Sequence, residues 1–304
     1  MGAIHETKTA CSHGVDSPPN PASLFEQLGC GEAGRSQRRT FRASLGSSCF
    51  TSSRFGSVVI GEPVAFVTGA SEGIGRAVAT HLVRLGYRTV AAARSSRRLD
   101  ELATEAGVIP VTVDVVDEQT VTRTVNRVES EIGPIDLLVN NAGIAGHSGV
   151  SWEQEPLEWW EVVEVSLRGT FLCSHAVLLE MIRRKRGRIV NLSSGAAANP
   201  IPDDYNARIN SAYMASKAAV NRFTEALAAE AGSFGVTVFA ISPGRVKTKM
   251  WREAVVEDWD EPNAWSAPEL AAELVACIAS GALDDHSGQF IHAAYDDWRT
   301  MAGL

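Results

Sequence analysis

Short, almost wholly apolar runs alternate with longer amphipathic stretches along the chain from Val64 onward. The short runs are apolar at nearly every position, as strands buried on both faces of a parallel sheet are. They predict strands over 64–67, 88–93, 108–113, 135–139, 188–192, 236–241 and 289–292. The longer stretches have the helical period and predict helices over 74–85, 97–106, 118–131, 157–184, 211–231 and 268–280.

This alternation of strand and helix predicts an α/β fold with a doubly wound parallel sheet, Rossmann-like, in a single domain over 58–304. With 45% hydrophobic and 21% charged residues, the chain has the composition of a globular protein with a sizeable core. Its 304 residues are enough for one large α/β domain and an extension.

The first 57 residues differ in composition from the rest. They hold ten serines, a proline-rich stretch over 17–21 and a net charge of +2, with no sustained apolar period. Such a segment cannot bury enough apolar surface to offset its ordering entropy, so we expect a disordered extension, or residues outside the mature protein. Its arginines and serines also fit organelle targeting, but four acids among the first 32 residues favour a cytoplasmic protein.

Charge and cysteine usage argue against several function classes. The formal net charge of −8 disfavours nucleic-acid binding, for which basic proteins are suited. The sequence has no run of about 18 apolar residues, so we expect no transmembrane helix and no membrane partner. Its five cysteines show neither a CxxC pair nor zinc-ligand spacing, so we expect no disulfide framework and no metal site.

Candidate chemistry lies where the predicted strands end, because ligands of open α/β sheets bind outside the carboxyl ends of the strands. The first strand runs into Gly69-x3-Gly73-x-Gly75, and a predicted helix follows. Glycines let the backbone approach a pyrophosphate closely, and a helix N-terminus offers it unpaired N–H groups. Alone, the motif also fits an ordinary glycine-rich turn, since its spacing differs from the GxGxxG fingerprint.

A tyrosine and a lysine open a later predicted helix. Tyr213 and Lys217 are four residues apart and therefore share one helix face. A nearby ammonium lowers the pKa of a tyrosine, and a tyrosine tuned toward neutral pH can exchange a proton with an alcohol or ketone oxygen. The same spacing also occurs by chance in surface pairs.

In combination, these motifs resemble the short-chain dehydrogenase/reductase family, in its common single-domain branch, over residues 62–293. The resemblance rests on the glycine-rich turn, Asn-Asn-Ala-Gly over 140–143, Ser194, Tyr213-x3-Lys217 and Pro-Gly-x3-Thr over 243–248, in the family's order. It implies an NAD(P)-dependent oxidoreductase that transfers a hydride between nicotinamide and a carbonyl or secondary alcohol.

The resemblance also implies roles for the matched positions. Tyr213 is expected to be the general acid/base, Lys217 to lower its pKa and hold the nicotinamide ribose, and Ser194, rather than Ser193, to bind the substrate oxygen. Asn140 is expected to lie along the cofactor. The other expected cofactor contacts are Gly69, Ser71, Gly73, Ile74, Gly75, Arg94, Asp114, Val115, Asn141, Ala142, Gly143, Tyr213, Lys217, Ser242, Pro243, Gly244, Val246 and Thr248.

Three features depart from the family pattern. Ser166 stands where the family commonly has an asparagine that helps a water chain relay protons to the lysine; its hydroxyl can substitute, or it marks a weaker site. Ser194 and Tyr213 are 19 residues apart, farther than is usual, with the surplus expected over 202–210 beside the substrate. The tail after Gly288 lacks the Asp-Gly-Gly of many relatives.

The nucleotide preference depends on the end of the second strand. NAD-dependent enzymes usually hold the adenosine ribose there with a carboxylate, whereas this chain has Ala93 and then Arg94. Arg94, helped by Arg97 or Arg98, can pair with a 2′-phosphate, which favours NADP over NAD. Glu72 in the glycine turn favours NAD instead, and the arginines also fit a solvated face.

The substrate side is expected to be covered by a lid over 249–267. A small apolar or aromatic carbonyl compound or alcohol is the expected substrate, with candidate pocket walls at His147, Trp152, Met250, Trp251 and Trp259. These tryptophans equally fit packing of the lid against the body. The family's members often form dimers or tetramers through the helices that begin near 157 and 211, so a homodimer or homotetramer is expected.

Two other functions stay open on the same fold. Ser166 and the long Ser194–Tyr213 spacing also fit a catalytically weak nucleotide-binding sensor or scaffold. A dehydratase or epimerase fits less well, because Ser194 with Tyr213 and Lys217 suits simple carbonyl reduction.

Overall fold

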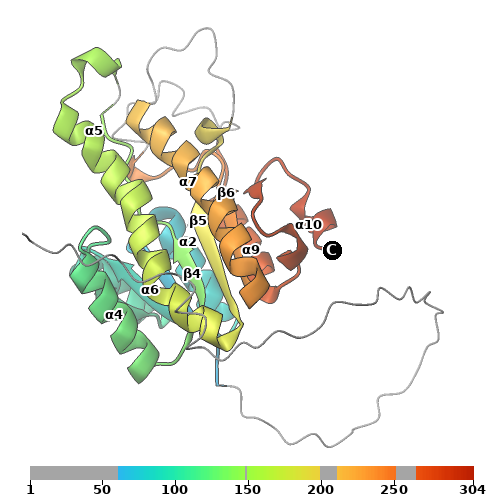
Figure 1. Ribbon diagram of the computed structural model, residues 1–304. Coiled ribbons are helices and arrows are strands. Elements are labelled where there is room, and N and C mark those ends of the chain that lie inside the picture. Colours follow the sequence, from blue (N-terminus) through green and yellow to red (C-terminus); the bar gives the residue numbers. More distant parts are fainter. Residues whose placement is uncertain (1–60, 148, 199–210, 251–264) are drawn as a thin grey trace, which may run out of the picture. The chain divides into compact units, whose positions relative to one another are not determined.

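The computed structural model of the chain describes residues 61–147, 149–198, 211–250 and 265–304. Internal contacts divide the chain into Met1–Gly56 and Ser57–Leu304, and the description concerns the second unit. The predicted extension over 1–57, the surplus segment 202–210 and most of the predicted lid lie outside the described residues. Within the described part, strands and helices follow one another in the predicted order (Figure 1).

Seven parallel strands form one sheet in the order β3-β2-β1-β4-β5-β6-β7. The strands are β1 (Val64–Thr68), β2 (Arg88–Ala93), β3 (Ile109–Thr112), β4 (Ile135–Asn140), β5 (Gly187–Leu192), β6 (Val236–Ser242) and β7 (Phe290–His292). The strand order reverses between β1 and β4, and a crevice forms at the carboxyl ends of strands at such a point. The predicted doubly wound parallel sheet is confirmed.

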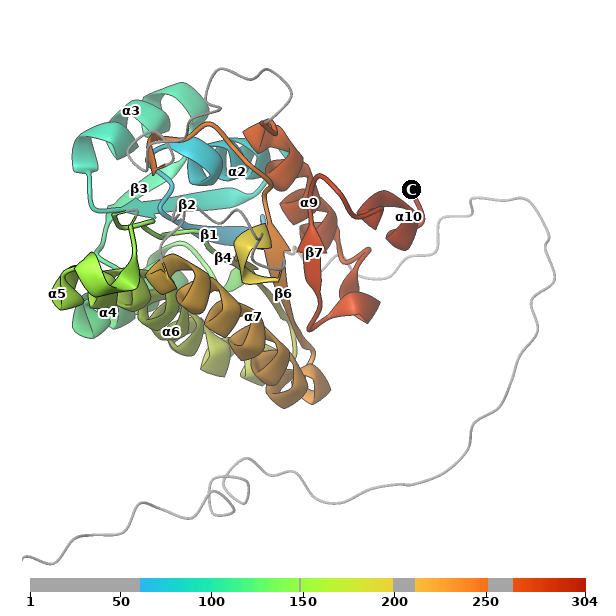
Figure 2. The same cartoon turned by 90° about the horizontal axis from the view of Figure 1, so that it is seen from above.

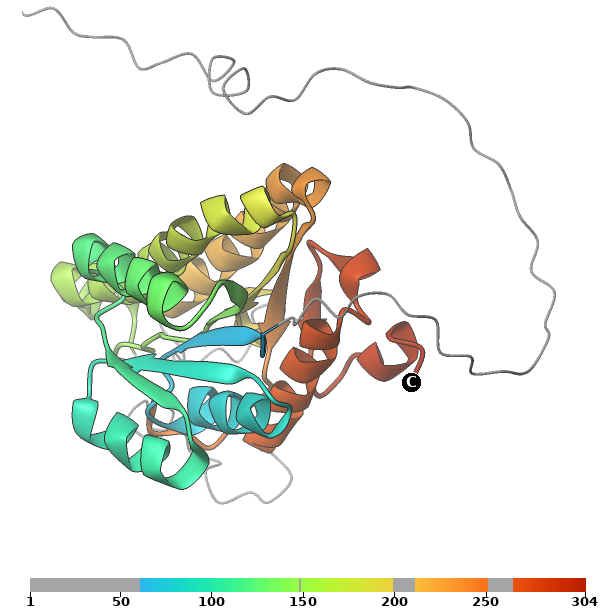
Figure 3. The same cartoon turned by 90° about the horizontal axis from the view of Figure 1, so that it is seen from below.

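Helices cover both faces of the sheet, as Figures 2 and 3 show. One face carries α2 (Gly73–Arg84), α3 (Ser96–Ala106) and α9 (Pro268–Ser280). The other carries α4 (Glu118–Glu131), α5 (Pro156–Val163), α6 (Gly169–Arg184) and α7 (Ser211–Ala231). The short α10 (Trp298–Met301) follows β7. Because each face packs a separate apolar core against its helices, the strands are apolar at nearly every position.

The predicted helix over 157–184 is α5 and α6 joined by a π-helical turn, η2 (Glu164–Arg168). Such turns are frequent at functional sites, and this one holds Ser166, which is fully buried. By length and composition the whole helix, Pro156–Arg184, is apolar enough to cross a membrane. It packs on β4, α4 and α7 as a core helix does, but 44% of its most apolar window is buried, so much of its apolar surface faces outward.

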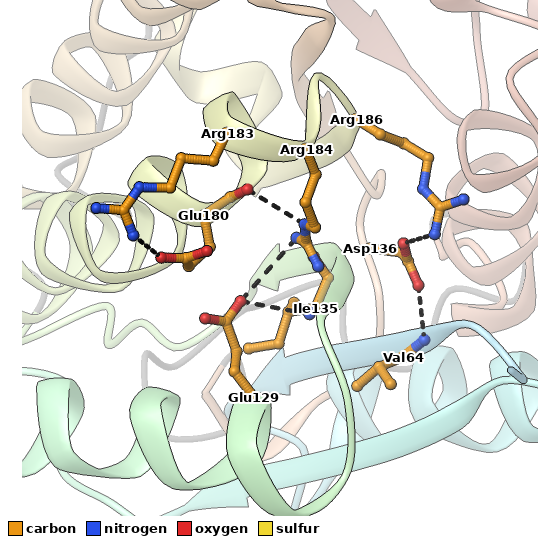
Figure 4. A network of polar contacts seen from close by, with 8 residues as sticks. All are labelled: Val64, Glu129, Ile135, Asp136, Glu180, Arg183, Arg184 and Arg186. Atoms are coloured by element: carbon orange, nitrogen blue, oxygen red, sulfur yellow. Dashed lines mark hydrogen bonds and ion pairs between the residues drawn. The ribbon is translucent and has the colours of Figure 1, made fainter. Parts of the chain in front are cut away.

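Charged side chains gather at the amino ends of β1 and β4 (Figure 4). Arg186 pairs with Asp136, whose second oxygen accepts the Val64 N–H at 3.1 Å. Arg184 donates to the Ile135 carbonyl at 2.8 Å. These contacts tie α6 to the start of two central strands. They lie at the amino ends of the strands, whereas the crevice forms at the carboxyl ends. These contacts therefore stabilise the fold without lining the crevice.

Candidate active site

A cavity of about 720 Å³ opens at the carboxyl ends of the strands. Its wall follows the β1–α2 turn, the residues after β2, β3, β4, β5 and β6, and the first turns of α7. Of the predicted site residues it is lined by Gly69, Ser71, Gly73, Ile74, Arg94, Asp114, Val115, Asn141, Ala142, Gly143, Ser194, Tyr213, Lys217, Pro243, Gly244 and Thr248. The structure therefore brings together residues spread over 180 positions of sequence.

The glycine-rich turn is fastened to the segment after β4. The Asn141 side-chain amide donates to the carbonyls of Thr68 and Gly69, at 3.0 and 3.1 Å. The Thr68 hydroxyl accepts the backbone N–H groups of Asn141 and Ala142, both at 3.0 Å. The sequence did not reveal this role of Thr68, although Thr68 is the last residue of β1 and directly precedes the glycines. Together these bonds form a clamp, Thr68–Asn141, that fixes the shape of the turn.

The backbone of this turn leaves room for a ligand that approaches closely. Gly69 and Gly73 have φ of +62° and +58°, where side chains are rarely tolerated. Gly75 does not line the cavity; a Cβ there would overlap the Asn141 amide and the Gly69 carbonyl, so its glycine serves the clamp. The side chain of Glu72, the N-cap residue of α2, makes no capping hydrogen bond. A backbone-lined turn before an uncapped helix start fits a dinucleotide pyrophosphate.

Ser194, Tyr213 and Lys217 meet on the floor of the cavity. Tyr213 is only 6% exposed and hydrogen-bonds the half-buried Ser194. The Lys217 ammonium donates to the Leu192 carbonyl at 2.6 Å and lies 5.8 Å from the centre of the Tyr213 ring. Ser193 is buried and donates to the Lys217 carbonyl at 3.2 Å. The geometry thus gives Ser194, not Ser193, the position next to the phenol.

Burial dominates the ionisation of both titratable groups. It lowers the pKa of Lys217 to about 8. Burial also raises the pKa of Tyr213, and the Ser194 hydrogen bond opposes that rise. We expected the lysine to lower the tyrosine pKa; within the protein itself the net direction is upward, because desolvation of the phenolate outweighs the other influences.

Ser166 lies behind the cavity wall, not on it. Its hydroxyl is fully buried and has no hydrogen-bond partner among the described residues. A Cβ placed on Gly143 would lie 3.5 Å from both Ser166 Oγ and Lys217 Nζ, so the two groups flank the same glycine. An orphaned hydroxyl in this place fits a bound water beside the lysine better than direct contact with substrate.

Besides Gly75, three other expected cofactor contacts do not line the cavity. Asn140 is buried under the cavity, where its amide donates to Asn191 Oδ1 at 2.9 Å and Ser174 Oγ at 3.0 Å. Ser242 and Val246 are likewise buried and absent from the cavity wall. The prediction that Asn140 lies along the cofactor is therefore wrong; it joins β4 to β5 and α6.

The far end of the cavity, beyond β2, carries arginines in different situations. Arg94 is exposed, lines the cavity and makes no ion pair with any described residue. Arg98 pairs with Glu72 at 2.6 Å, and both line the cavity. Arg97 is outside it and pairs with Glu101 at 3.2 Å. Arg97 and Arg98 were both expected to help Arg94 bind a 2′-phosphate, but only Arg98 lines the cavity.

The end near α5 is more polar than the sequence suggested. Glu158 and Glu161 line it, and Glu158 pairs with His147 at 2.9 Å. The prediction of Trp152 as a wall is wrong, because its side chain is 83% exposed and outside the cavity. Met250 does line it, whereas Trp251 and Trp259 lie outside the described residues. Within the described ranges no cluster of three or more potential metal ligands occurs.

Comparison with known proteins shows similarity to short chain dehydrogenases and reductases. The family model of short chain dehydrogenases matches residues 63–259. A short chain dehydrogenase of Pseudocercospora fijiensis is 42% identical over 61% of this chain; the match spans 60% of that relative, less than two thirds of its length. Acetoacetyl-CoA reductase of Paracoccus denitrificans is 38% identical over 71% of this chain and 90% of its own. The solved ribose-5-phosphate isomerase structure from Brucella melitensis has a TM-score of 0.70 at 31% identity, covering 80% and 97%.

Proposed function

Because the chain belongs to the short chain dehydrogenase family, we propose that it is an NADP-dependent oxidoreductase acting between a carbonyl and a secondary alcohol. One observation carries the proposal. The buried phenol of Tyr213 is hydrogen-bonded to Ser194 and lies beside Lys217 in a cavity that the glycine-rich turn also lines.

Each side chain has a distinct task in this reaction. The nicotinamide, when bound, supplies or accepts the hydride. Ser194 donates a hydrogen bond to the substrate oxygen and holds it beside Tyr213. Tyr213 transfers a proton to that oxygen during reduction; a raised pKa keeps the phenol protonated at neutral pH, which suits it as a donor. Lys217 binds the nicotinamide ribose, and its ammonium stabilises the phenolate that remains.

The direct test is turnover by the full-length chain. NADPH and NADH are each incubated with a panel of ketones and aldehydes, and NADP and NAD with the matching alcohols. Reduced-nicotinamide absorbance is expected to fall with at least one carbonyl compound. Tight nucleotide binding without turnover in either direction would support the alternative of a nucleotide-binding sensor or scaffold, which Ser166 in place of the family's asparagine left open.

The preference for NADP is supported by the charges at the far end of the cavity. The residue that ends β2 is Ala93, so no carboxylate stands there to bind the 2′-hydroxyl of NAD. Arg94 is exposed in the cavity and free to pair with a 2′-phosphate, within the described part of the chain. Glu72 would repel that phosphate, but Arg98 neutralises it at 2.6 Å.

Cofactor binding is expected to take up protons near pH 8. With its pKa lowered to about 8, Lys217 is part neutral at that pH before the nucleotide is added. Phosphate charge and ribose hydroxyls favour the ammonium form, so binding raises the pKa and draws a proton from solution. Affinity should therefore fall as the pH rises above 8 and stay level below it.

Calorimetry in two buffers of different ionisation enthalpy measures this uptake. Lys217→Met is the control, since it removes the titrating group and should abolish the uptake at pH 8. An equal uptake in the variant would mean that another group titrates and would contradict the assignment.

A homo-oligomer is proposed through the outer face of α5 and α6. That face exposes Leu157, Trp160, Phe171 and Leu179, with exposed fractions from 47% to 85%. Exposed apolar side chains gathered on one helix are typical of subunit interfaces. Sedimentation is expected to give a multiple of 32.5 kDa, and Phe171→Glu to shift it toward one chain. The matched change Leu85→Glu, at an exposed residue after α2, should leave the mass unchanged; a wild-type monomer would contradict the proposal.

A further inference from the structure

The first residue of α7 is held by two side chains from other parts of the chain. Ser211 Oγ accepts the indole N–H of Trp159 at 3.0 Å. The same oxygen shares a hydrogen bond with Ser151 Oγ at 2.8 Å. Trp159 belongs to α5, and Ser151 begins the short 3-10 turn η1 (Ser151–Glu153). Three separate elements therefore meet at one hydroxyl at the start of the helix that carries the catalytic tyrosine.

Tyr213 follows Ser211 by two residues and lies in the same first turn of α7. The first N–H groups of a helix have no partner within it, so a first turn opens more easily than the rest unless other groups hold it. The ring of Trp159 packs in a small apolar cluster with Ala212, Tyr213 and Val162. The indole thus contacts this turn twice, through its ring and through its N–H.

The indole N–H of the neighbouring Trp160 makes no such hydrogen bond with a described residue. Trp160 is 59% exposed, and its ring meets Trp159 edge-on with centroids 5.1 Å apart. The Trp159 N–H points inward across α5 to α7, at a half-buried position where a donor without a partner would be costly.

We infer that Trp159 is a positioning residue for the reaction: through its hydrogen bond to Ser211 it fixes the first turn of α7 and so the place of the Tyr213 hydroxyl beside Ser194. The inference rests on the proposed function, because it concerns how well the phenol is aligned for proton transfer. A misplaced acid slows the step in which the proton moves, whereas the hydrogen bond between Trp159 and Ser211 does not touch the glycine-rich turn.

Trp159→Phe tests this, because it keeps an aromatic ring in the cluster and removes only the donor. We expect kcat to fall about fivefold, the factor that corresponds to the loss of one neutral hydrogen bond. The dissociation constant of NADPH should not change, and the solvent deuterium isotope effect on kcat should rise because proton transfer becomes more limiting. Ser211→Ala should behave alike, and Ser211→Thr, which keeps a hydroxyl, should restore activity.

The matched control is Trp160→Phe, the same change one residue along, which should leave kcat and the isotope effect as they are. Unchanged kcat in Trp159→Phe would overturn the inference, and so would a loss of kcat with no rise in the isotope effect. Amide exchange over 213–217 is followed in the same variants and should speed up in Trp159→Phe and Ser211→Ala but not in Trp160→Phe. If the wild type binds NADPH but shows no turnover, the proposed function is wrong. Unchanged amide exchange in Trp159→Phe would separately contradict the inference that Trp159 holds the first turn of α7.

Discussion

Replacing Tyr213 by phenylalanine is expected to lower kcat by about 100- to 10,000-fold, the range over which a general acid contributes. The change removes one oxygen, the atom that gives its proton to the substrate. The ring stays in the apolar cluster with Ala212 and Val162, so the variant should fold and bind NADPH as the wild type does. Steady-state kinetics with the best substrate of the panel and calorimetry with NADPH measure the two quantities.

The matched control is Tyr295→Phe, the same chemical change at a side chain that is 78% exposed. Its kcat and NADPH affinity should equal those of the wild type. If Tyr213→Phe kept most of the activity, the acid would have to be another group, and the proposed mechanism would be wrong. If the variant lost nucleotide binding as well, the phenol would serve the cofactor site rather than the proton step.

Arg94→Ala is expected to weaken NADPH binding about tenfold, because it removes a charge-assisted hydrogen bond to the 2′-phosphate at an exposed position. NADH lacks that phosphate, so its affinity should stay the same. The selectivity between the two nucleotides therefore changes by the same factor. Calorimetry at low ionic strength is the suitable measurement, since salt screens exposed charges.

Arg97→Ala is the control for this charge. Arg97 lies three residues along, outside the cavity, and pairs with Glu101. Its removal should change neither affinity, although it lowers the net charge by the same amount. Equal losses of NADPH and NADH affinity in Arg94→Ala would show that Arg94 contacts a part common to both nucleotides. No loss at all would remove the structural support for NADP.

The sheet and its helices could be predicted because most of the strands are buried on both faces. Continuous apolar runs follow from that burial, and the ends of most of them lie within a residue or two of the observed strands. The π-helical turn over 164–168 could not be predicted. It is only five residues long and lies between two helices, so the apolar pattern of the whole span predicts a single α-helix.

The wall of the cavity was predictable for a different reason: its glycines and small residues follow the strands directly. The error at Asn140 shows the limit. Asn140 is the last residue of β4 and Asn141 the first after it, and side chains alternate in direction along a strand. One amide therefore reaches into the buried network with Asn191 and the other into the clamp with Thr68. Composition alone cannot assign the two directions.

The substrate end was the least predictable part. Glu158 and Glu161 look like the solvated face of a helix in sequence, and only the packing of α5 over the cavity brings them to its wall. Trp152 looks like a pocket residue but stands exposed. The position of a side chain at this end of the cavity depends on how the helices pack on the sheet, and that packing depends on contacts with segments distant in sequence.

The Thr68–Asn141 clamp has a consequence for how the protein is made. The amide that shapes the glycine turn is 72 residues downstream of Gly69. A ribosome delivers the turn before it delivers this side chain, so the clamp cannot form until β4 and Asn141 have been synthesised. Under the proposed function, bound nucleotide is therefore not expected to stabilise the earliest part of the domain. It can stabilise the growing chain only after β4 has joined β1, which couples cofactor capture to the pairing of the two central strands.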